Sequence, residues 1–285
     1  VKDNGPWKND LSISTATFTF NFHNDYNSKY SLHSLTKFGA GKIKKDKISI
    51  SGYLNDHIFN YIQITENFYE LDLLKHLVYT VEKGAVAIDV GANIGNHSIF
   101  FGKYISKKVI AIEPSKKLYK ILKNNLFNNL NKGMYEISQF AVGSEKKEAR
   151  LVYPNESNLG QAQVSYSNDS KNSEKIKIDT LDNIINSLRI KGKINLLKVD
   201  VEGMDIEVLW GARKLIKKNK PHIVVEANSK HDLMRIIKYL DTFKFKYINI
   251  GKFCKTPTYH FIPSSSVSSR LQKILLLNAT KSNIN

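Results

Sequence analysis

Acidic side chains follow several of the apolar runs in this sequence. Four of them are Glu113, Asp200, Glu202 and Glu226. If those runs are parallel strands, their carboxyl ends meet at one edge of a sheet, which is where open α/β proteins bind ligands. A carboxylate at that edge can accept a proton from a substrate hydroxyl or hold a cofactor by hydrogen bonds. The spacing therefore predicts one crevice lined by carboxylates.

A turn with two glycines follows another apolar run, in Ile-Asp-Val-Gly-Ala-Asn-Ile-Gly at 88–95. Glycine lets the backbone approach a ligand closely, although a tight strand-to-helix turn also needs glycine for structural reasons. Asn93 stands where a dinucleotide site has its second glycine, and His97 stands where a P-loop ending at Gly102-Lys103 has its first. Both phosphate-binding patterns are therefore absent.

The elements that position these groups alternate between strands and helices. Apolar runs predict strands at 86–90, 109–112, 134–142, 194–199 and 221–226. Helical spacing predicts helices at 68–81, 99–105, 206–218 and 231–243, a short one opening at 179–182, and one that Ser115 caps. The polar segment 144–175 is typical of a hairpin or insertion, and 247–250 is expected to pair with 259–262. This alternation implies an α/β fold with a parallel sheet covered by helices on both faces.

The flanking regions follow other patterns. Residues 15–22 and 47–51 predict strands, and the segment after Ser264 predicts a helix around Leu271 and Ile274. We expect an N-terminal extension over 1–60 that contacts the substrate or another subunit, a domain over 61–263 and a tail over 264–285.

Four motifs in this order resemble the FkbM family of S-adenosylmethionine-dependent methyltransferases, most of which methylate sugar hydroxyls. They are Asp-Val-Gly-Ala-Asn-Ile-Gly (89–95), Ile-Glu-Pro (112–114), Leu-Lys-Val-Asp-Val-Glu-Gly (197–203) with Val-Leu-Trp-Gly-Ala (208–212), and Pro-His-Ile-Val-Val-Glu (221–226). Phe68-Tyr69-Glu70 and Thr180-Leu181-Asp182 also resemble the family's pattern, and the likeness covers about residues 62–250. It implies a Rossmann-like class I methyltransferase fold with an N-terminal extension.

The resemblance also implies positions for S-adenosyl-L-methionine. The residues expected around its methionyl part are Asp89, Gly91, Asn93 and Gly95, with Glu113 on the ribose, Gln139 and Ala141 beside the adenine, and Glu70 closing over the cofactor.

The candidates for the base that takes the proton of the acceptor hydroxyl are Asp200, Glu202, Glu226 and His97. Asp200 is favoured because it ends the fourth strand, and Glu226 is expected to orient the acceptor. Asp200, Glu226 and Asn228 also have the oxygen ligands that Mg²⁺ uses, but a metal is not favoured. The predicted reaction is O-methylation of a sugar in the biosynthesis of a bacterial surface polysaccharide or glycolipid.

The composition bears on partners and compartment. There are 43 Lys+Arg against 26 Asp+Glu, a formal net charge of +17 carried mostly by scattered lysines. Such a surface suits an anionic acceptor, such as a diphosphate-linked sugar, and also allows a peripheral contact with an anionic membrane. The single cysteine and the lack of a signal-peptide pattern favour the cytoplasm. The sequence leaves the oligomeric state open.

Two rival functions stay open at this stage. A methyltransferase acting on RNA would suit the charge, but no adjacent prolines follow Asp200, Cys254 lies outside the motifs, and arginine is scarce. Nucleic acid is therefore not favoured, and methylation of a small metabolite is a further option. A non-catalytic cofactor-binding module on the same fold is the second rival, because fold does not dictate function.

Overall fold

The computed structural model describes residues 15–23, 45–54, 56–153, 159–167, 173–250 and 257–266. The helix expected around Leu271 and Ile274 lies outside these ranges. No helix in the described ranges is both long and apolar enough to cross a membrane.

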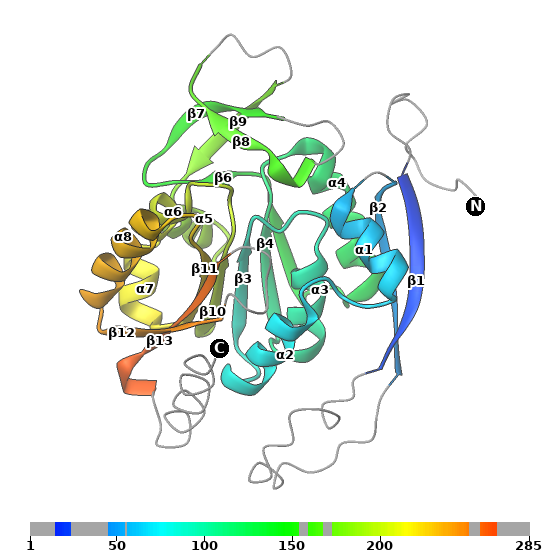
Figure 1. The fold of residues 1–285 in the computed structure, drawn as a ribbon, viewed down its shortest axis with the longest axis horizontal. Helices are drawn as coiled ribbons and strands as arrows, with labels where there is room; N and C mark the ends of the chain where they lie inside the picture. Colours follow the sequence, from blue (N-terminus) through cyan, green and yellow to red (C-terminus); the bar gives the residue numbers. More distant parts are fainter. Residues whose placement is uncertain are drawn as a thin grey trace, which may run out of the picture.

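Seven strands of the described chain form the central sheet, in the order β12-β13-β11-β10-β3-β4-β5 (Figure 1). They are β3 (Val86–Val90), β4 (Lys108–Ile112), β5 (Tyr135–Ser138), β10 (Ile194–Val199), β11 (His222–Glu226), β12 (Phe245–Asn249) and β13 (Thr258–Pro263). The five strands from β3 to β5 and β10 to β11 in this list run parallel to one another. Strand β13 is inserted antiparallel between β11 and β12. The predicted parallel sheet and the closing pair of strands are confirmed.

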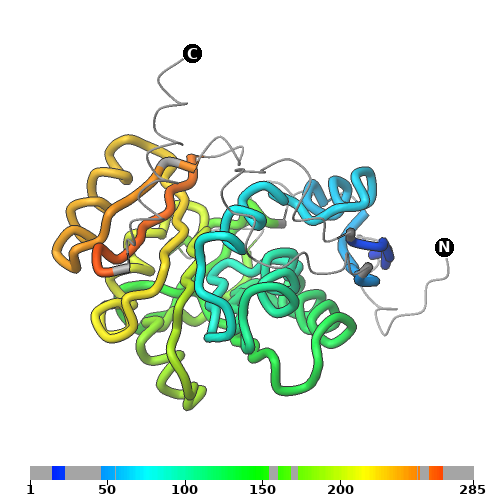
Figure 2. Tube along the Cα trace, turned by 90° about the horizontal axis from the view of Figure 1, so that it is seen from below, coloured from blue at the N-terminus to red at the C-terminus, as the bar shows by residue number. Residues whose placement is uncertain are grey.

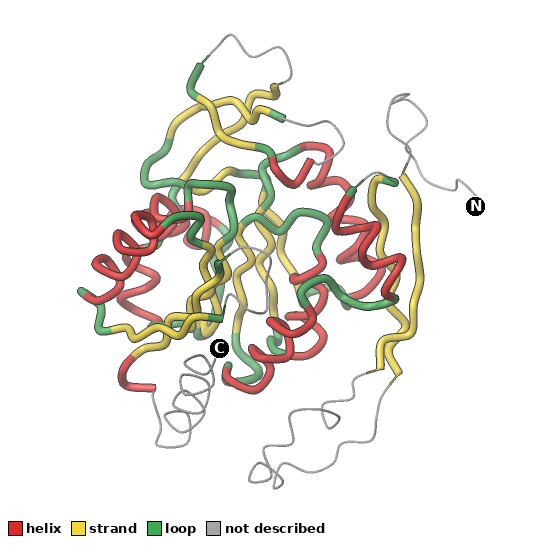
Figure 3. Tube along the Cα trace, viewed as in Figure 1, coloured by secondary structure: helices red, strands yellow, loops and turns green. Residues whose placement is uncertain are grey.

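Helices cover both faces of this sheet, as Figure 3 shows in red on either side of the central strands. One face carries α1 (His57–Thr65), α2 (Leu71–Thr80), α3 (Asn96–Tyr104) and α4 (Lys116–Asn129). The other face carries α5 (Leu181–Ser187), α6 (Asp205–Gly211), α7 (Arg213–Asn219) and α8 (Lys230–Asp241). The predicted cap of α4 is confirmed, because the Ser115 hydroxyl accepts a hydrogen bond from the Leu118 amide.

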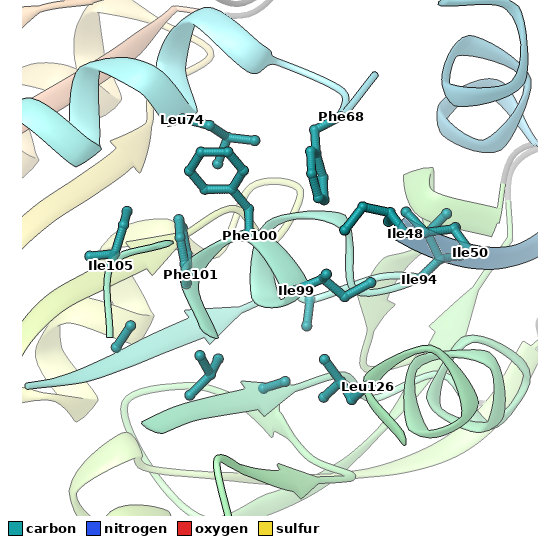
Figure 4. Packing of buried hydrophobic residues seen from close by; sticks show 14 of the residues in the cluster. Ile48, Ile50, Phe68, Leu74, Ile94, Ile99, Phe100, Phe101, Ile105 and Leu126 are labelled. Atoms are coloured by element: carbon teal, nitrogen blue, oxygen red, sulfur yellow. The ribbon is translucent and has the colours of Figure 1, made fainter. Parts of the chain in front are cut away.

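The N-terminal hairpin shares the core of the first face. Its strands β1 (Thr15–His23) and β2 (Lys45–Tyr53) are antiparallel and bury Phe20, Phe22 and Ile50 in the cluster that also holds Phe68 and Phe100. Figure 4 shows Phe68, Leu74 and Phe100 gathered in this core. The hairpin and the β12–β13 pair lie at opposite ends of the molecule (Figures 1 and 2).

Two asparagines of α4 bind the edge of β2 as a neighbouring strand would. The Asn125 side chain accepts a hydrogen bond from the Ser51 amide (2.7 Å) and donates one to the Ser51 carbonyl (2.8 Å). Asn129, one turn later, does the same at Ser49 (3.0 and 2.6 Å). We call this pair the amide ladder; it satisfies backbone groups that an edge strand leaves unpaired.

A second, four-stranded sheet stands above the carboxyl ends of the central strands (Figure 1). It consists of β6 (Ala141–Val142), β7 (Lys147–Val152), β8 (Gln163–Ser165) and β9 (Ser173–Asp179), with a 3-10 turn at Leu159–Gln161. Tyr153 fixes it to the start of α4, because its hydroxyl lies 2.8 Å from Ser115 Oγ and 2.7 Å from Glu174 Oε1. This sheet is the insertion predicted over 144–175.

Two predicted elements are wrong in their extent. The strand at 134–142 is two strands, because Ala141 leaves the central sheet and pairs with Ile178 of β9. The helix at 206–218 is broken at Ala212, where α7 begins anew. The Asp182 carboxylate accepts hydrogen bonds from the amides of Lys214 and Leu215 and so serves the free N–H groups of the new helix.

Candidate functional site

A cavity of about 830 Å³ opens at the carboxyl ends of β3, β4, β10 and β11. The second sheet covers it with Leu151 and Val164, and α1 contributes His57 and Ile58. Its volume is in the range of pockets that hold a drug-sized ligand. The crevice predicted from the strand-end acids therefore exists.

The glycine turn forms one wall of the cavity through an unusual run of backbone conformations. Gly91, Asn93 and Gly95 have φ angles of +75°, +52° and +93°. A Cβ at position 91 would lie 1.8 Å from the carbonyl oxygen of Asp200, so only glycine fits at this position. The turn thus holds the end of β3 against the end of β10.

Glu113 lies buried at the end of β4 and binds this turn. Its carboxylate accepts hydrogen bonds from the backbone amides of Asn93 and Ser115, each at 2.9 Å. Burial raises the pKa of Glu113 to about 7, although these two hydrogen bonds act in the opposite direction. Glu113 still lines the cavity and has lone pairs free to accept ribose hydroxyls.

A buried lysine joins the carboxylates of β3 and β10. Lys198 Nζ lies 3.3 Å from Asp89 Oδ1 and 3.1 Å from Asp200 Oδ2, and it donates to the Gly91 carbonyl at 3.3 Å. Burial opposes its charge, but Asp200 and Asp89 raise the pKa of Lys198 above its usual range. Asp89, fully buried, also accepts a hydrogen bond of 2.6 Å from Ser98 Oγ.

The carboxyl groups of Asp200 and Glu226 lie next to each other on the cavity, close enough for a protonated Glu226 to donate to Asp200. Burial and the neighbouring charge of Asp200 raise the pKa of Glu226 to about 8. Burial also favours a neutral Asp200, but Lys198 and the Glu226 hydrogen bond outweigh it and lower the pKa of Asp200. At neutral pH, Asp200 therefore accepts a hydrogen bond from a protonated Glu226.

Two further acids crowd this end of the cavity. Burial, followed by the charge of Asp200, raises the pKa of Glu202, and the same two causes raise the pKa of Asp205 to about 7. Glu202 has a φ of +50°, in the left-handed region that non-glycine residues adopt uncommonly.

Glu70 and His97 form a pair on the cavity lining, with 3.3 Å between Glu70 Oε2 and His97 Nε2. The His97 ring also stacks on Phe101 at 6.1 Å. The segment before α2 is fixed by Asn96, whose side chain bonds both the amide and the carbonyl of Tyr69 at 3.0 Å. His97 is thus held at the wall by its partner Glu70.

Most of the site residues expected from the sequence lie on this cavity. Those that line it are Glu70, Gly91, Asn93, His97, Glu113, Ala141, Asp200, Glu202 and Glu226. Asp89 and Gly95 lie behind the lining and support it. Gln139 is exposed and does not belong to the described lining, where its neighbour Phe140 stands instead.

The sequence reasoning assigned no role to Lys198, Asp205 or Asn96. A lysine inside the apolar run of β10 was the available signal, because a buried ammonium needs carboxylate partners. Among the described residues, no group of three or more His, Cys, Asp or Glu side chains is arranged to hold a metal ion. Asn228, considered for Mg²⁺, lines the cavity but is exposed.

The sheet order, the inserted antiparallel strand and a cavity over the glycine turn together define a Rossmann-like class I methyltransferase. A family model described as the methyltransferase FkbM domain matches residues 89–247. The chain belongs to the FkbM methyltransferase family, as its motifs predict, and the methyl donor of this class is S-adenosyl-L-methionine.

Two relatives are named methyltransferases. The chain is 28% identical over 152 residues to methyltransferase sdnD of Sordaria araneosa, covering 44% of this chain and 59% of that protein. It is 25% identical over 175 residues to hexuronic acid methyltransferase AglP of Haloferax volcanii, covering 61% and 69%. The match to sdnD thus spans less than two thirds of that protein's length.

Two solved structures align with similar shares of this chain. An FkbM methyltransferase from Methylobacillus flagellatus aligns with a TM-score of 0.45 and 19% identity, over 64% of this chain and 44% of that one. A Streptococcus mutans protein in complex with SAH aligns with a TM-score of 0.42 and 14% identity, over 68% and 97%.

The cavity fits this cofactor by its own chemistry. Asn93 Oδ1 is buried at the cavity wall and has no hydrogen-bond partner among the described residues, so it can accept one from a ligand amino group. The carboxylate of Glu70 suits a ligand with a net positive charge. Asn93 and Glu70 would hold the methionyl part, and Glu113 would hold the ribose.

Proposed function

We propose that this protein transfers a methyl group from S-adenosyl-L-methionine to a hydroxyl group of a sugar. The observation that carries the proposal is the Asp200–Glu226 carboxyl pair, which stands at the cavity wall where the glycine turn meets β10. A site for methyl transfer to oxygen needs a cofactor wall and a proton acceptor in one cavity, and we assign these roles to the glycine turn and to Asp200.

The cofactor supplies an electrophilic methyl group when it is bound. The chain must then hold the acceptor oxygen in line with that group, and such positioning is worth several kcal/mol. A sugar hydroxyl is a weak nucleophile, so a base that takes its proton accelerates the reaction by roughly 10²–10⁴-fold. The Asp200 carboxylate is this base, and Glu226 orients it by donating a hydrogen bond.

The sugar class is supported by the relative AglP, which is named a hexuronic acid methyltransferase. We assign the acceptor to the biosynthesis of a bacterial surface polysaccharide or glycolipid, made in the cytoplasm. The lysine-rich exterior suits an acceptor whose carrier portion is anionic.

The test separates cofactor binding from catalysis. Calorimetry should show that wild type and Asp200→Ala bind S-adenosylmethionine within a few-fold of each other. Transfer of labelled methyl to sugar acceptors should fall by roughly 10²-fold or more in Asp200→Ala. Asp241→Ala, which removes an exposed aspartate at the end of α8, is the matched control and should keep wild-type activity. Failure of the wild type to bind S-adenosylmethionine would refute the proposal.

A further inference from the structure

Acidic side chains outnumber basic ones on the cavity lining, whereas basic side chains outnumber acidic ones in the chain as a whole. Five carboxyl side chains line it, those of Glu70, Glu113, Asp200, Glu202 and Glu226. Lys198 is the one lysine or arginine among the described lining residues, in a chain with 43 of them and only 26 acids. The lysine excess of the chain is therefore not found among the residues that line the cavity.

The positive charge of Lys198 is already balanced by two carboxylates. Its ammonium lies between Asp89 and Asp200, at 3.3 and 3.1 Å, and its side chain is only 6% exposed. An incoming anion would have to replace one of these carboxylates. Because the partners left behind would be buried without a counter-charge, the fold resists that exchange.

The two histidines that line the cavity also contact other side chains. His97 pairs with Glu70 at 3.3 Å. The His57 ring packs edge-on against the ring of Tyr69, with centroids 5.9 Å apart. Both histidine rings therefore already contact side chains of the protein.

The acceptor end of the cavity disfavours further negative charge. Glu202, Asp205 and Glu226 each meet the charge of Asp200, and each already binds its proton more tightly than usual. A carboxylate on the sugar ring would add a like charge to this group. A neutral hydroxyl or an ammonium group instead finds acceptors for its hydrogen bonds.

We propose that the sugar ring seated in this cavity bears no negative charge, and that a neutral or amino sugar is preferred to the uronic acid of otherwise equal structure. This rests on the proposed function and deepens it. It sets this chain apart from AglP, whose printed name specifies a hexuronic acid. An anionic phosphate of the acceptor, expected from the net charge, would then lie outside the cavity.

The test compares three glycosides that differ at one group only: p-nitrophenyl galactoside, galactosaminide and galacturonide, each offered with labelled S-adenosylmethionine. Matched gluco- and manno-configured sets guard against a wrong ring configuration. We expect methylation of the neutral or amino members, with kcat/KM for the uronide lower by about tenfold or more. A uronide methylated as well as or better than its neutral partner would overturn the inference and leave the proposed function standing.

A charge variant supplies an independent readout. Glu202→Gln removes one carboxylate from the cavity and should raise the uronide-to-neutral ratio several-fold. Glu207→Gln is the matched control, because Glu207 pairs with Arg235 at 3.6 Å and lies outside the described lining; its ratio should stay at the wild-type value. An unchanged ratio in Glu202→Gln counts against the inference. If a protein that binds S-adenosylmethionine methylates none of the glycosides, the proposed function fails with it.

Discussion

The two halves of the cavity hold their carboxylates in opposite ways. At the ends of β3 and β4, each carboxylate has donors supplied by the fold: Ser98 and Lys198 for Asp89, and two backbone amides for Glu113. At the ends of β10 and β11, the carboxyl groups of Asp200 and Glu226 lie next to each other, with further acids close by.

The difference separates a part of the site that is complete by itself from a part that responds to its surroundings. Donors from the backbone and from buried side chains fix the first half before any ligand arrives. The charge of the second half depends on pH through Glu226 and Asp205, whose pKa values are about 8 and 7, whereas in the first half it depends on pH through Glu113, with a pKa of about 7. Lys198 belongs to both halves, so it offers the strongest way to disturb the comparison.

The largest effect is expected from Lys198→Met. Removing the ammonium leaves Asp89 buried and both carboxylates without their counter-charge, so the free energy of unfolding should fall by about 3–5 kcal/mol. Urea denaturation measures this loss. Lys193→Met is the control, because Lys193 is 63% exposed and lies 3.7 Å from Glu82; it should cost about 1 kcal/mol or less. Equal losses in the two variants would show that Lys198 does not unite the halves.

The glycine turn offers a matched pair of substitutions. Gly91→Ala places a Cβ 1.8 Å from the Asp200 carbonyl oxygen at a φ of +75°, so strain and overlap together should cost roughly 3 kcal/mol or more. Gly203→Ala has a φ of +97° but meets nothing within 4 Å, so it should cost only about 1 kcal/mol. Thermal or urea unfolding of both variants tests this, and a larger loss at Gly203 would contradict the close approach of β3 and β10.

A third pair compares one acid from each half. Asp89→Asn weakens the hydrogen bond with Ser98 and the contact with Lys198, so it should cost about 1.5–3 kcal/mol. Asp205→Asn removes a charge that burial and Asp200 already disfavour, so its stability at pH 7 should stay within about 1 kcal/mol of wild type. Chemical denaturation at pH 7 measures both, and a reversed order would refute the contrast.

The last prediction concerns the dependence of stability on pH. Glu226 keeps its proton in the folded state up to a pKa of about 8, whereas in the unfolded chain it loses that proton near the ordinary glutamate pKa of 4.5. The stabilisation from this group is therefore complete below pH 4.5 and is lost as pH rises through 8. The free energy of unfolding of Glu226→Gln should fall less steeply than that of wild type across this window. Identical slopes in urea titrations at several pH values would contradict it.

Much of the fold was predictable because one pattern dominated each segment. The run 86–90 is apolar, bounded by polar residues and a glycine, and β3 has these bounds. The break at Ala212 was not predictable, because it depends on Asp182, which is distant in sequence and supplies the caps of α7. The prediction of one strand at 134–142 was wrong for a similar reason, since β6 pairs with β9, which is distant in sequence.

The residues of the site were likewise predictable only in part. Acids at strand ends were predictable, because parallel strands bring their carboxyl ends to one edge of the sheet. Lys198 was missed because a lysine in an apolar run fits either a solvated strand edge or a buried ion pair, and only the tertiary structure selects one. The exposure of Gln139 likewise follows from the departure of Ala141 into the second sheet.

The amide ladder of α4 has a consequence for how this protein tolerates sequence change. Within the hairpin, Asn125 and Asn129 bond to backbone amides and carbonyls of Ser49 and Ser51, so these bonds do not depend on the side chains that the hairpin carries there. Mutations could therefore accumulate on the outward face of the hairpin without detaching it from the helix. Loss of either asparagine would remove an attachment that no substitution in the hairpin itself can restore.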